Sequence, residues 1–316
     1  MSEVFSLWGG AASFGGLNQT EQGFKWDPLR CALESILRYE CWRLGRYLEI
    51  GDRARGSICK FGDATSLCFN DVGYFNRVYD FGAESVPMLP EILDSYSRCW
   101  GRAGRYGIEL IARHGFELAS VGDQLLEAGF RPGDLMVRLG LSLECEQPYM
   151  ERGRRECLPG DGLNGFLRER DVRVAIRQPQ LEEFDRVLDL YLEGFEAPRS
   201  NREGAKRNMM RLFEQPEFLT WCAFEAHGGS VCFPVALGML YLTDGVAVLA
   251  AGVTGKEYRN RGLHEAMIQL RVAHAKSIGC RSIFTWTQYD GQSHRNLIAS
   301  GFEELRVDQV WRREPF

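Results

Sequence analysis

The stretch from residue 246 to residue 277 constrains the fold of this chain more than any other. Residues 246–253 are Val, Leu, Ala and one Gly, directly after an Asp244-Gly245 turn. An apolar run without polar alternation is typical of a strand that is buried on both faces. Leu263, Met267 and Leu270 then recur at helical spacing. The stretch therefore predicts a central strand, a short loop and a long helix.

The loop between this strand and helix carries two arginines and a glycine, in the order Arg259-Asn260-Arg261-Gly262. A short loop that ends on glycine as a helix begins can direct several backbone N–H groups at one anion, together with the positive end of the helix dipole. Arginine side chains would add charge-assisted hydrogen bonds. The backbone from Arg259 to His264 is therefore a candidate diphosphate-binding site.

This loop resembles the pyrophosphate-binding loop of the GCN5-related N-acetyltransferases (GNAT), whose pattern is Gln/Arg-x-x-Gly-x-Gly/Ala. Glu257-Tyr258, directly before the loop, is also usual in that family. The last position differs, because His264 stands where glycine or alanine is expected. The resemblance implies an α/β (α+β) fold of the GNAT type, with a mixed central sheet flanked by helices. It also implies an N-acyltransferase that uses acetyl-CoA or another acyl-CoA.

The order of the predicted elements in the second half matches that fold over about 140 residues. Hydrophobic periodicity and turn residues predict strand, two helices, three strands, helix, strand, helix and strand. The predicted ranges are 172–176, 181–195, 202–213, 218–226, 235–243, 246–253, the long helix from 263, 282–287, 293–300 and 304–312.

The first half predicts a similar but weaker pattern. Its predicted elements are a helix at 27–46, strands at 57–61, 65–69 and 75–79, a helix at 89–99, a strand at 107–112, a helix at 121–128 and a strand at 134–143. Residues 124–130, which end in Gly129-Phe130, resemble residues 296–302, which end in Gly301-Phe302. The repeat suggests that the fold is duplicated.

Residues before 145 carry no Arg-x-x-Gly-x-Gly between a predicted strand and helix. The first half should therefore not bind a coenzyme in the usual way, which is a pattern found in tandem members of the GNAT family. We expect a degenerate GNAT-like domain at 1–145, a linker at 146–171 that is rich in charge, Gly and Pro, and a catalytic GNAT domain at 172–316.

Composition excludes several other classes of protein. The chain has 316 residues and a net charge of −5, without a dense Lys/Arg stripe, so binding to nucleic acid is not expected. No stretch of about 18 apolar residues exists, and the N-terminus lacks the features of a signal peptide. The ten cysteines form no Cys-x-x-Cys pair and no metal-binding spacing, which predicts free thiols, no bound metal and a cytoplasmic location.

The resemblance also implies where the coenzyme binds. In the family, the central strand diverges from the next parallel strand, and the pantetheine arm of coenzyme A lies in the gap. Here those strands are 246–253 and 282–287. Backbone N–H groups near Gly252, Val253 and Thr254 are candidates for polarising the thioester carbonyl. The remaining candidates for coenzyme binding are Arg259, Asn260, Arg261, Gly262, Leu263, His264, Ser293 and Asn296.

Catalytic side chains are harder to predict. A general base must accept the proton of the attacking amine, directly or through water. Glu225 near a strand end, Asp244 in a turn and His264 at a helix start are the candidates. Many family members carry a tyrosine five residues before the final Gly-Phe phenylalanine, where it can protonate the thiolate. Leu297 occupies that position here, so no such acid is expected.

The sequence thus predicts transfer of an acyl group from a coenzyme A thioester to the amine of a small molecule, by direct attack. Two alternatives stay open. One is an acyl donor bound to an acyl carrier protein or to a tRNA, and the other is a protein that binds acyl-CoA without catalysis. No membrane partner is expected.

Overall fold

The computed structural model describes residues 27–49, 56–70, 72–100, 107–113, 116–144, 158–159, 165–169, 172–197, 202–225 and 233–315. Contacts divide the chain into two compact units. Unit 1 consists of the residues up to Cys31, Arg53–Gly133 and Val310–Phe316. Unit 2 joins Ala32–Asp52 to Asp134–Gln309. No described helix is long and apolar enough to cross a membrane.

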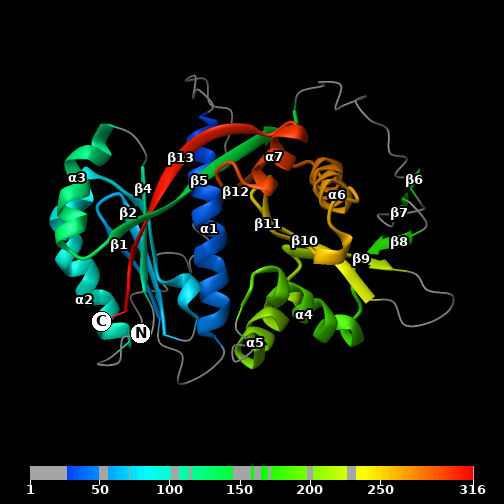
Figure 1. Cartoon of the computed structure of the whole chain (residues 1–316), viewed down its shortest axis with the longest axis horizontal. Helices are drawn as coiled ribbons and strands as arrows, with labels where there is room; N and C mark the ends of the chain where they lie inside the picture. The colour runs from blue at the N-terminus through cyan, green and yellow to red at the C-terminus, as the bar shows by residue number, and fades with distance from the viewer. Residues whose placement is uncertain are drawn as a thin grey trace. The chain divides into compact units, whose positions relative to one another are not determined.

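Unit 1 contains a small sheet with two helices. Strands β1 (Gly56–Phe61), β2 (Ala64–Phe69) and β3 (Arg77–Phe81) pair antiparallel, and β3 pairs parallel with β4 (Ile108–Arg113). Helices α2 (Leu89–Trp100) and α3 (Phe116–Glu127) cover the sheet (Figure 1). The buried core between them includes Ile92, Tyr96, Leu110 and Phe130.

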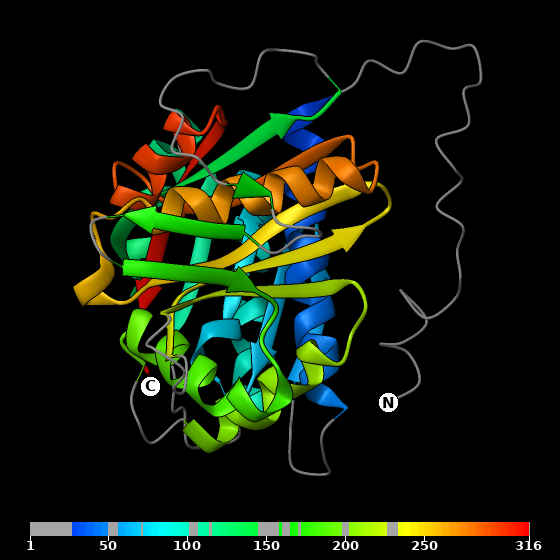
Figure 2. The ribbon, with the colours of Figure 1, turned by 90° about the vertical axis from the view of Figure 1, so that its right-hand side faces the viewer.

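Unit 2 is built on a larger mixed sheet with helices on both faces (Figures 1 and 2). Its strand order is β13-β5-β12-β11-β10-β9-β8-β7-β6. These strands are β5 (Arg131–Ser142), β6 (Leu158–Pro159), β7 (Gly165–Glu169), β8 (Val172–Arg177), β9 (Phe218–Glu225), β10 (Phe233–Thr243), β11 (Val246–Thr254), β12 (Ser282–Gln288) and β13 (Glu303–Arg313). The helices are α1 (Pro28–Leu48), α4 (Phe184–Gly194), α5 (Arg202–Phe213), α6 (Leu263–Ser277) and α7 (Gln292–Ala299). The mixed sheet flanked by helices confirms the predicted fold class.

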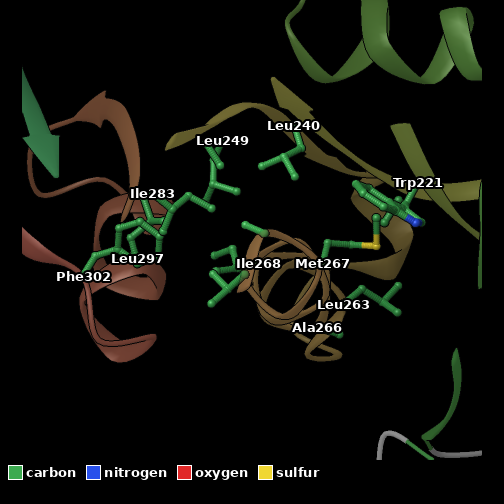
Figure 3. Packing of buried hydrophobic residues seen from close by; sticks show 14 of the residues in the cluster. Trp221, Leu240, Leu249, Leu263, Ala266, Met267, Ile268, Ile283, Leu297 and Phe302 are labelled. Atoms are coloured by element: carbon green, nitrogen blue, oxygen red, sulfur yellow. The ribbon is translucent and has the colours of Figure 1, made fainter. Parts of the chain in front are cut away.

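The main core of unit 2 lies between the sheet and the helices α6 and α7. Figure 3 shows Leu249 and Ile283 from neighbouring strands packed near Ile268 of α6 and Leu297 of α7. Helix α4 lies on the opposite face of the sheet, as Figure 2 shows. Side chains of a strand alternate between its two faces, so Tyr241 points away from the core that contains Leu240. Its ring lies 5.3 Å from that of Tyr39, which places α1 on the face opposite α6.

The two halves repeat one order of elements. In each, two antiparallel strand pairs are followed by a parallel pair: β1-β2-β3-β4 in unit 1 and β9-β10-β11-β12 in unit 2. Gly129 and Gly301 both have φ of +86° after a helix. The following Phe130 and Phe302 donate their N–H to the helix carbonyls of Leu125 and Leu297, at 2.9 and 3.1 Å. This shared order supports the predicted duplication.

Each compact unit takes residues from both halves of the chain. Residues 136–142 of β5 pair antiparallel with residues 288–282 of β12 in unit 2. Trp311, near the end of β13, lies in the core of unit 1. Residues 165–169 of the predicted linker form β7, which pairs with β8. The physical reason is that exposed strand edges carry backbone N–H and C=O groups that need partners.

Candidate functional site

The site is built around the point where strands β11 and β12 separate. Their parallel pairing covers only Val246–Val248 against Ser282–Phe284, although β11 continues to Thr254 and β12 to Gln288. Beyond this point the Thr285 hydroxyl donates a hydrogen bond to the Leu249 carbonyl at 3.1 Å. A side chain thus replaces the regular ladder where the strands part. The resemblance implies that these two strands diverge, and their parallel pairing ends at this point.

Strand β11 bulges directly after the separation. Leu249 pairs with Leu240, but Gly252 pairs with Gly238, so two residues of β11 lie opposite one residue of β10. Arg271 of α6 holds this bulge. Its Nη1 donates to the carbonyls of Ala251 and Met239, both at 3.0 Å. Glycine is required opposite, because a Cβ on Gly238 would lie 2.8 Å from the Arg271 Nε.

Arg271 is the main functional feature that sequence reasoning missed. Its side chain is 2% exposed, and burial lowers the pKa of the guanidinium to about 9. A signal was present in the sequence, because position 271 falls on the same helical face as Leu263 and Met267. A charged residue within the apolar stripe of a helix indicates a specific buried interaction.

The loop after β11 leads into α6 through a left-handed turn. Asn260 and Gly262 have φ of +61° and +75°, and Gly262 is the N-cap residue without a side-chain cap. The first helical hydrogen bond runs from the Ala266 N–H to the Gly262 carbonyl at 3.0 Å. The N–H groups of Leu263, His264 and Glu265 precede that bond and are available to a ligand. Exposed Arg259 and Arg261 add positive charge beside them.

His264 links the two helices that follow the diverging strands. Its Nδ1 lies 2.9 Å from the Asn296 Nδ2 of α7, and the Asn296 Oδ1 accepts a bond of 2.8 Å from Gln292. The Asn296 amide nitrogen therefore donates to Nδ1, and the imidazole carries its hydrogen on Nε2. Burial and the nearby Arg271 charge lower the pKa of His264 to about 4. This neutral imidazole is a poor proton acceptor near pH 7.

The other two candidate bases lie elsewhere. Glu225 accepts a hydrogen bond from the Tyr258 hydroxyl, which raises the pKa of Tyr258 to about 12. Asp244 forms an ion pair with Arg38 at the far end of β11. Eight residues of extended chain separate it from Gly252, which is roughly 25 Å at 3.3 Å per residue. The structure therefore places Asp244 far along β11 from Gly252.

The remaining predicted coenzyme contacts lie at the end of β11, in the loop that follows it and on α7. Gly252, Val253 and Thr254 form the end of β11, and the Arg259 Nε donates to the Thr254 carbonyl at 3.4 Å. Ser293 and Asn296 lie half-buried on α7. The N-cap of that helix is Gly291, so Ser293 does not cap it. Among the described residues, no group of three or more His, Cys, Asp or Glu side chains could hold a metal ion.

The corresponding strands of unit 1 differ. Strand β3 pairs with β4 as far as Phe81 and Ala112, with a register shift between Val78 and Phe81. The connection after β3 contains Gly82, whose added Cβ would lie 2.7 Å from the Glu84 carboxylate. An acidic side chain at this place opposes the binding of a phosphate. Among the described residues of unit 1, the paired strands β3 and β4 do not part before β3 ends, and no basic loop follows β3.

Comparisons with known proteins agree with this geometry. Residues 184–302 match the model of the acetyltransferase (GNAT) family. No curated protein matches the chain. A conserved protein of unknown function from Staphylococcus epidermidis ATCC 12228 has a similar structure, with a TM-score of 0.54 and 10% identity over 84% of this chain and 94% of that one.

Two further solved structures are similar. A GCN5-related N-acetyltransferase from Sphaerobacter thermophilus gives a TM-score of 0.53 and 15% identity, over 79% of this chain and 80% of that one. A tandem GNAT protein from the clavulanic acid biosynthesis pathway gives 0.51 and 12%, over 82% and 79%. At these identities the likeness concerns the fold.

The fold and the family match together define an N-acyltransferase enzyme. More specifically, the chain carries a domain of the acetyltransferase (GNAT) family at residues 184–302, as the loop predicted. Enzymes of this family take their acyl group from acetyl-CoA or another acyl-CoA.

Proposed function

We propose that this protein transfers an acyl group from a coenzyme A thioester to the amine of a small molecule. One observation carries the proposal: β11 and β12 part after Val248 and Phe284, beside a glycine-capped helix start with free N–H groups. Beyond Val248 the edge of β11 is not paired with β12, and an extended pantetheine arm can pair with that edge. Its diphosphate can then lie against the backbone from Asn260 to His264.

The reaction that this site would support is direct attack. The amine nitrogen forms a bond to the thioester carbon, the C–S bond breaks, and coenzyme A leaves as its thiol after the amine proton passes to water and a proton reaches the sulfur. N–H groups near Gly252 would stabilise the oxyanion that forms on the carbonyl. His264, with its pKa lowered to about 4, is not proposed as the base.

A ligand titration tests the proposal. A ligand that binds only the native state at 100 times its dissociation constant raises the free energy of unfolding by about 2.7 kcal/mol. We expect acetyl-CoA to stabilise the protein by this amount and a pantetheine thioester without the nucleotide to do so only at far higher concentration. Equal responses to both would favour a carrier-bound donor. The absence of any response to acetyl-CoA would contradict the proposal.

Binding alone does not distinguish an enzyme from a coenzyme-binding protein. Release of free thiol from acetyl-CoA, measured with a panel of small amines, makes that distinction. We expect at least one primary amine to accelerate the release over the rate without protein.

A further inference from the structure

Two hydrogen-bond donors from α6 converge beside Gly252 of β11. A Cβ placed on Gly252 would lie 3.3 Å from the Nε2 of His264 and 3.5 Å from the Nη2 of Arg271. Both nitrogens therefore face the side of the strand that lacks a side chain. The position lies beyond Val248, the last residue of β11 that pairs with β12.

The Arg271 guanidinium uses only part of its donor capacity within the described residues. Its Nε bonds the Met267 carbonyl at 2.8 Å, and its Nη1 bonds the carbonyls of Met239 and Ala251. Nη2 makes no hydrogen bond with the described part of the chain, and no carboxylate there forms an ion pair with Arg271. A cation that is 2% exposed and meets only carbonyl dipoles will favour a further oxygen acceptor.

His264 supplies the second donor. Because Nδ1 accepts the hydrogen bond of Asn296, the hydrogen of the neutral ring is on Nε2. That N–H also has no acceptor among the described residues. Asn296 belongs to α7, which follows β12, while His264 belongs to α6, which follows β11. The imidazole is thus held between α6 and α7, the helices that follow the two diverging strands.

We propose that the His264 Nε2–H and the Arg271 Nη2–H together bind a carbonyl oxygen of the acyl donor where it passes Gly252. This inference rests on the proposed function and names two side chains that act on the donor. The carbonyl has two possible sources with the same chemistry, the thioester itself and an amide of the pantetheine arm. In either case His264 is a hydrogen-bond donor to the substrate and not a base.

The test measures the affinity of the full chain for acetyl-CoA and for coenzyme A by calorimetric titration. The variants are H264A, which removes one donor, H264Q, which retains an N–H donor, and G252A, which places a methyl group in front of both donors. Because Arg271 also holds three backbone carbonyls, its replacement would disturb the fold, and the test does not depend on it. H274Q is the matched control, since His274 lies on the same helix with its ring 5.0 Å from that of Trp221.

We expect H264A and G252A to weaken binding by on the order of tenfold, and H264Q and H274Q to bind within about threefold of the unmodified protein. A loss confined to acetyl-CoA identifies the thioester carbonyl as the acceptor. An equal loss for both ligands identifies an amide of the arm.

The outcomes separate this inference from the proposed function. If the unmodified protein binds both ligands and folded H264A and G252A bind them equally well, the donor pair is wrong while the function stands. If the unmodified protein binds neither ligand, the proposed function fails and this inference fails with it. The melting temperature of each variant establishes that it is folded.

Discussion

Gly262 and Gly279 both adopt the left-handed conformation, one before and one after α6, with φ of +75° and +82°. A non-glycine residue at either position should cost about 1–2 kcal/mol of stability. Only Gly262 lies among the N–H groups proposed to bind the diphosphate. We therefore predict that G262E abolishes binding of coenzyme A, while G279E loses similar stability and binds normally. Thermal unfolding and titration with coenzyme A measure both effects. Normal binding by G262E would place the diphosphate elsewhere.

His264 should also make stability depend on pH. Its pKa falls from an ordinary 6.5 to about 4 in the fold, so the unfolded chain takes up a proton first as the pH decreases. The free energy of unfolding is then unaffected above pH 6.5 and decreases between pH 6.5 and 4, by on the order of 3 kcal/mol in total. We predict that H264Q removes this part of the acid sensitivity.

Urea unfolding at pH 7 and pH 4.5 measures the prediction. The comparison is the loss of free energy between the two pH values in the unmodified protein and in H264Q. Protonation of carboxylates with a lowered pKa, such as Glu109, destabilises both proteins equally, so this contribution cancels in the comparison. Equal losses in the two proteins would show that His264 is solvated.

Among individual residues, the sequence could predict the loop but not its partners. Arg259, Gly262 and His264 are neighbours in the chain, so their shared place follows from local pattern. The contacts of His264 with Asn296 and of Arg271 with Ala251 join residues that are 32 and 20 positions apart. Such contacts depend on how α6 and α7 lie on the sheet. No local spacing encodes that, although a charge in an apolar helical stripe signals that a partner exists.

Helix α4 approaches β11 closely through a single glycine. A Cβ on Gly194 would lie 2.2 Å from the Val253 Cγ1. We predict that G194A forces the helix away from the strand and costs about 1–3 kcal/mol, because overpacked cores must shift. Shortening the opposing side chain should relieve the clash, so the double variant G194A/V253A should be more stable than the two single losses added together predict.

Denaturant unfolding of the two single variants and the double variant measures this coupling. G45A is a matched control, because nothing lies within 4 Å of a Cβ on that helical glycine. Alanine in a helix interior should raise stability there by about 0.5–1 kcal/mol. Additive losses in the double variant would show that Gly194 does not contact Val253.

Most helices and strands could be predicted from the sequence because their signals are local. Asp27 before Pro28 predicted the start of α1, and the Asp27 carboxylate accepts bonds from the Leu29 and Arg30 N–H groups at 3.1 and 3.2 Å. The partners of the closing strands could not be predicted. The apolar residues at alternate positions of β5 indicate a strand, but not that its neighbour is β12. The alternation of apolar and polar residues along a strand indicates which side chains are buried. Which strands become neighbours depends on the whole fold.

Unit 1 is completed by residues that come late in the sequence. Trp311 is 5% exposed in the core of unit 1, although more than 170 residues separate it from Phe130 in the same core. We predict that W311A costs about 3–5 kcal/mol and accelerates amide exchange in β1–β4, with little effect on β9–β11. W221A, in the core of unit 2, should produce the opposite distribution. Uniform acceleration across both units in W311A would contradict this assignment.

The placement of Val310–Phe316 within unit 1 has a consequence for synthesis on the ribosome. At about 5–20 residues per second, the nearly 180 residues that follow Gly133 take roughly 10–35 s to emerge. Throughout that interval the early part of the chain has its β4 and Phe130 but not the tryptophan that completes their packing. The N-terminal portion therefore keeps apolar surface exposed to chaperones until residues 310–316 have also emerged from the ribosome.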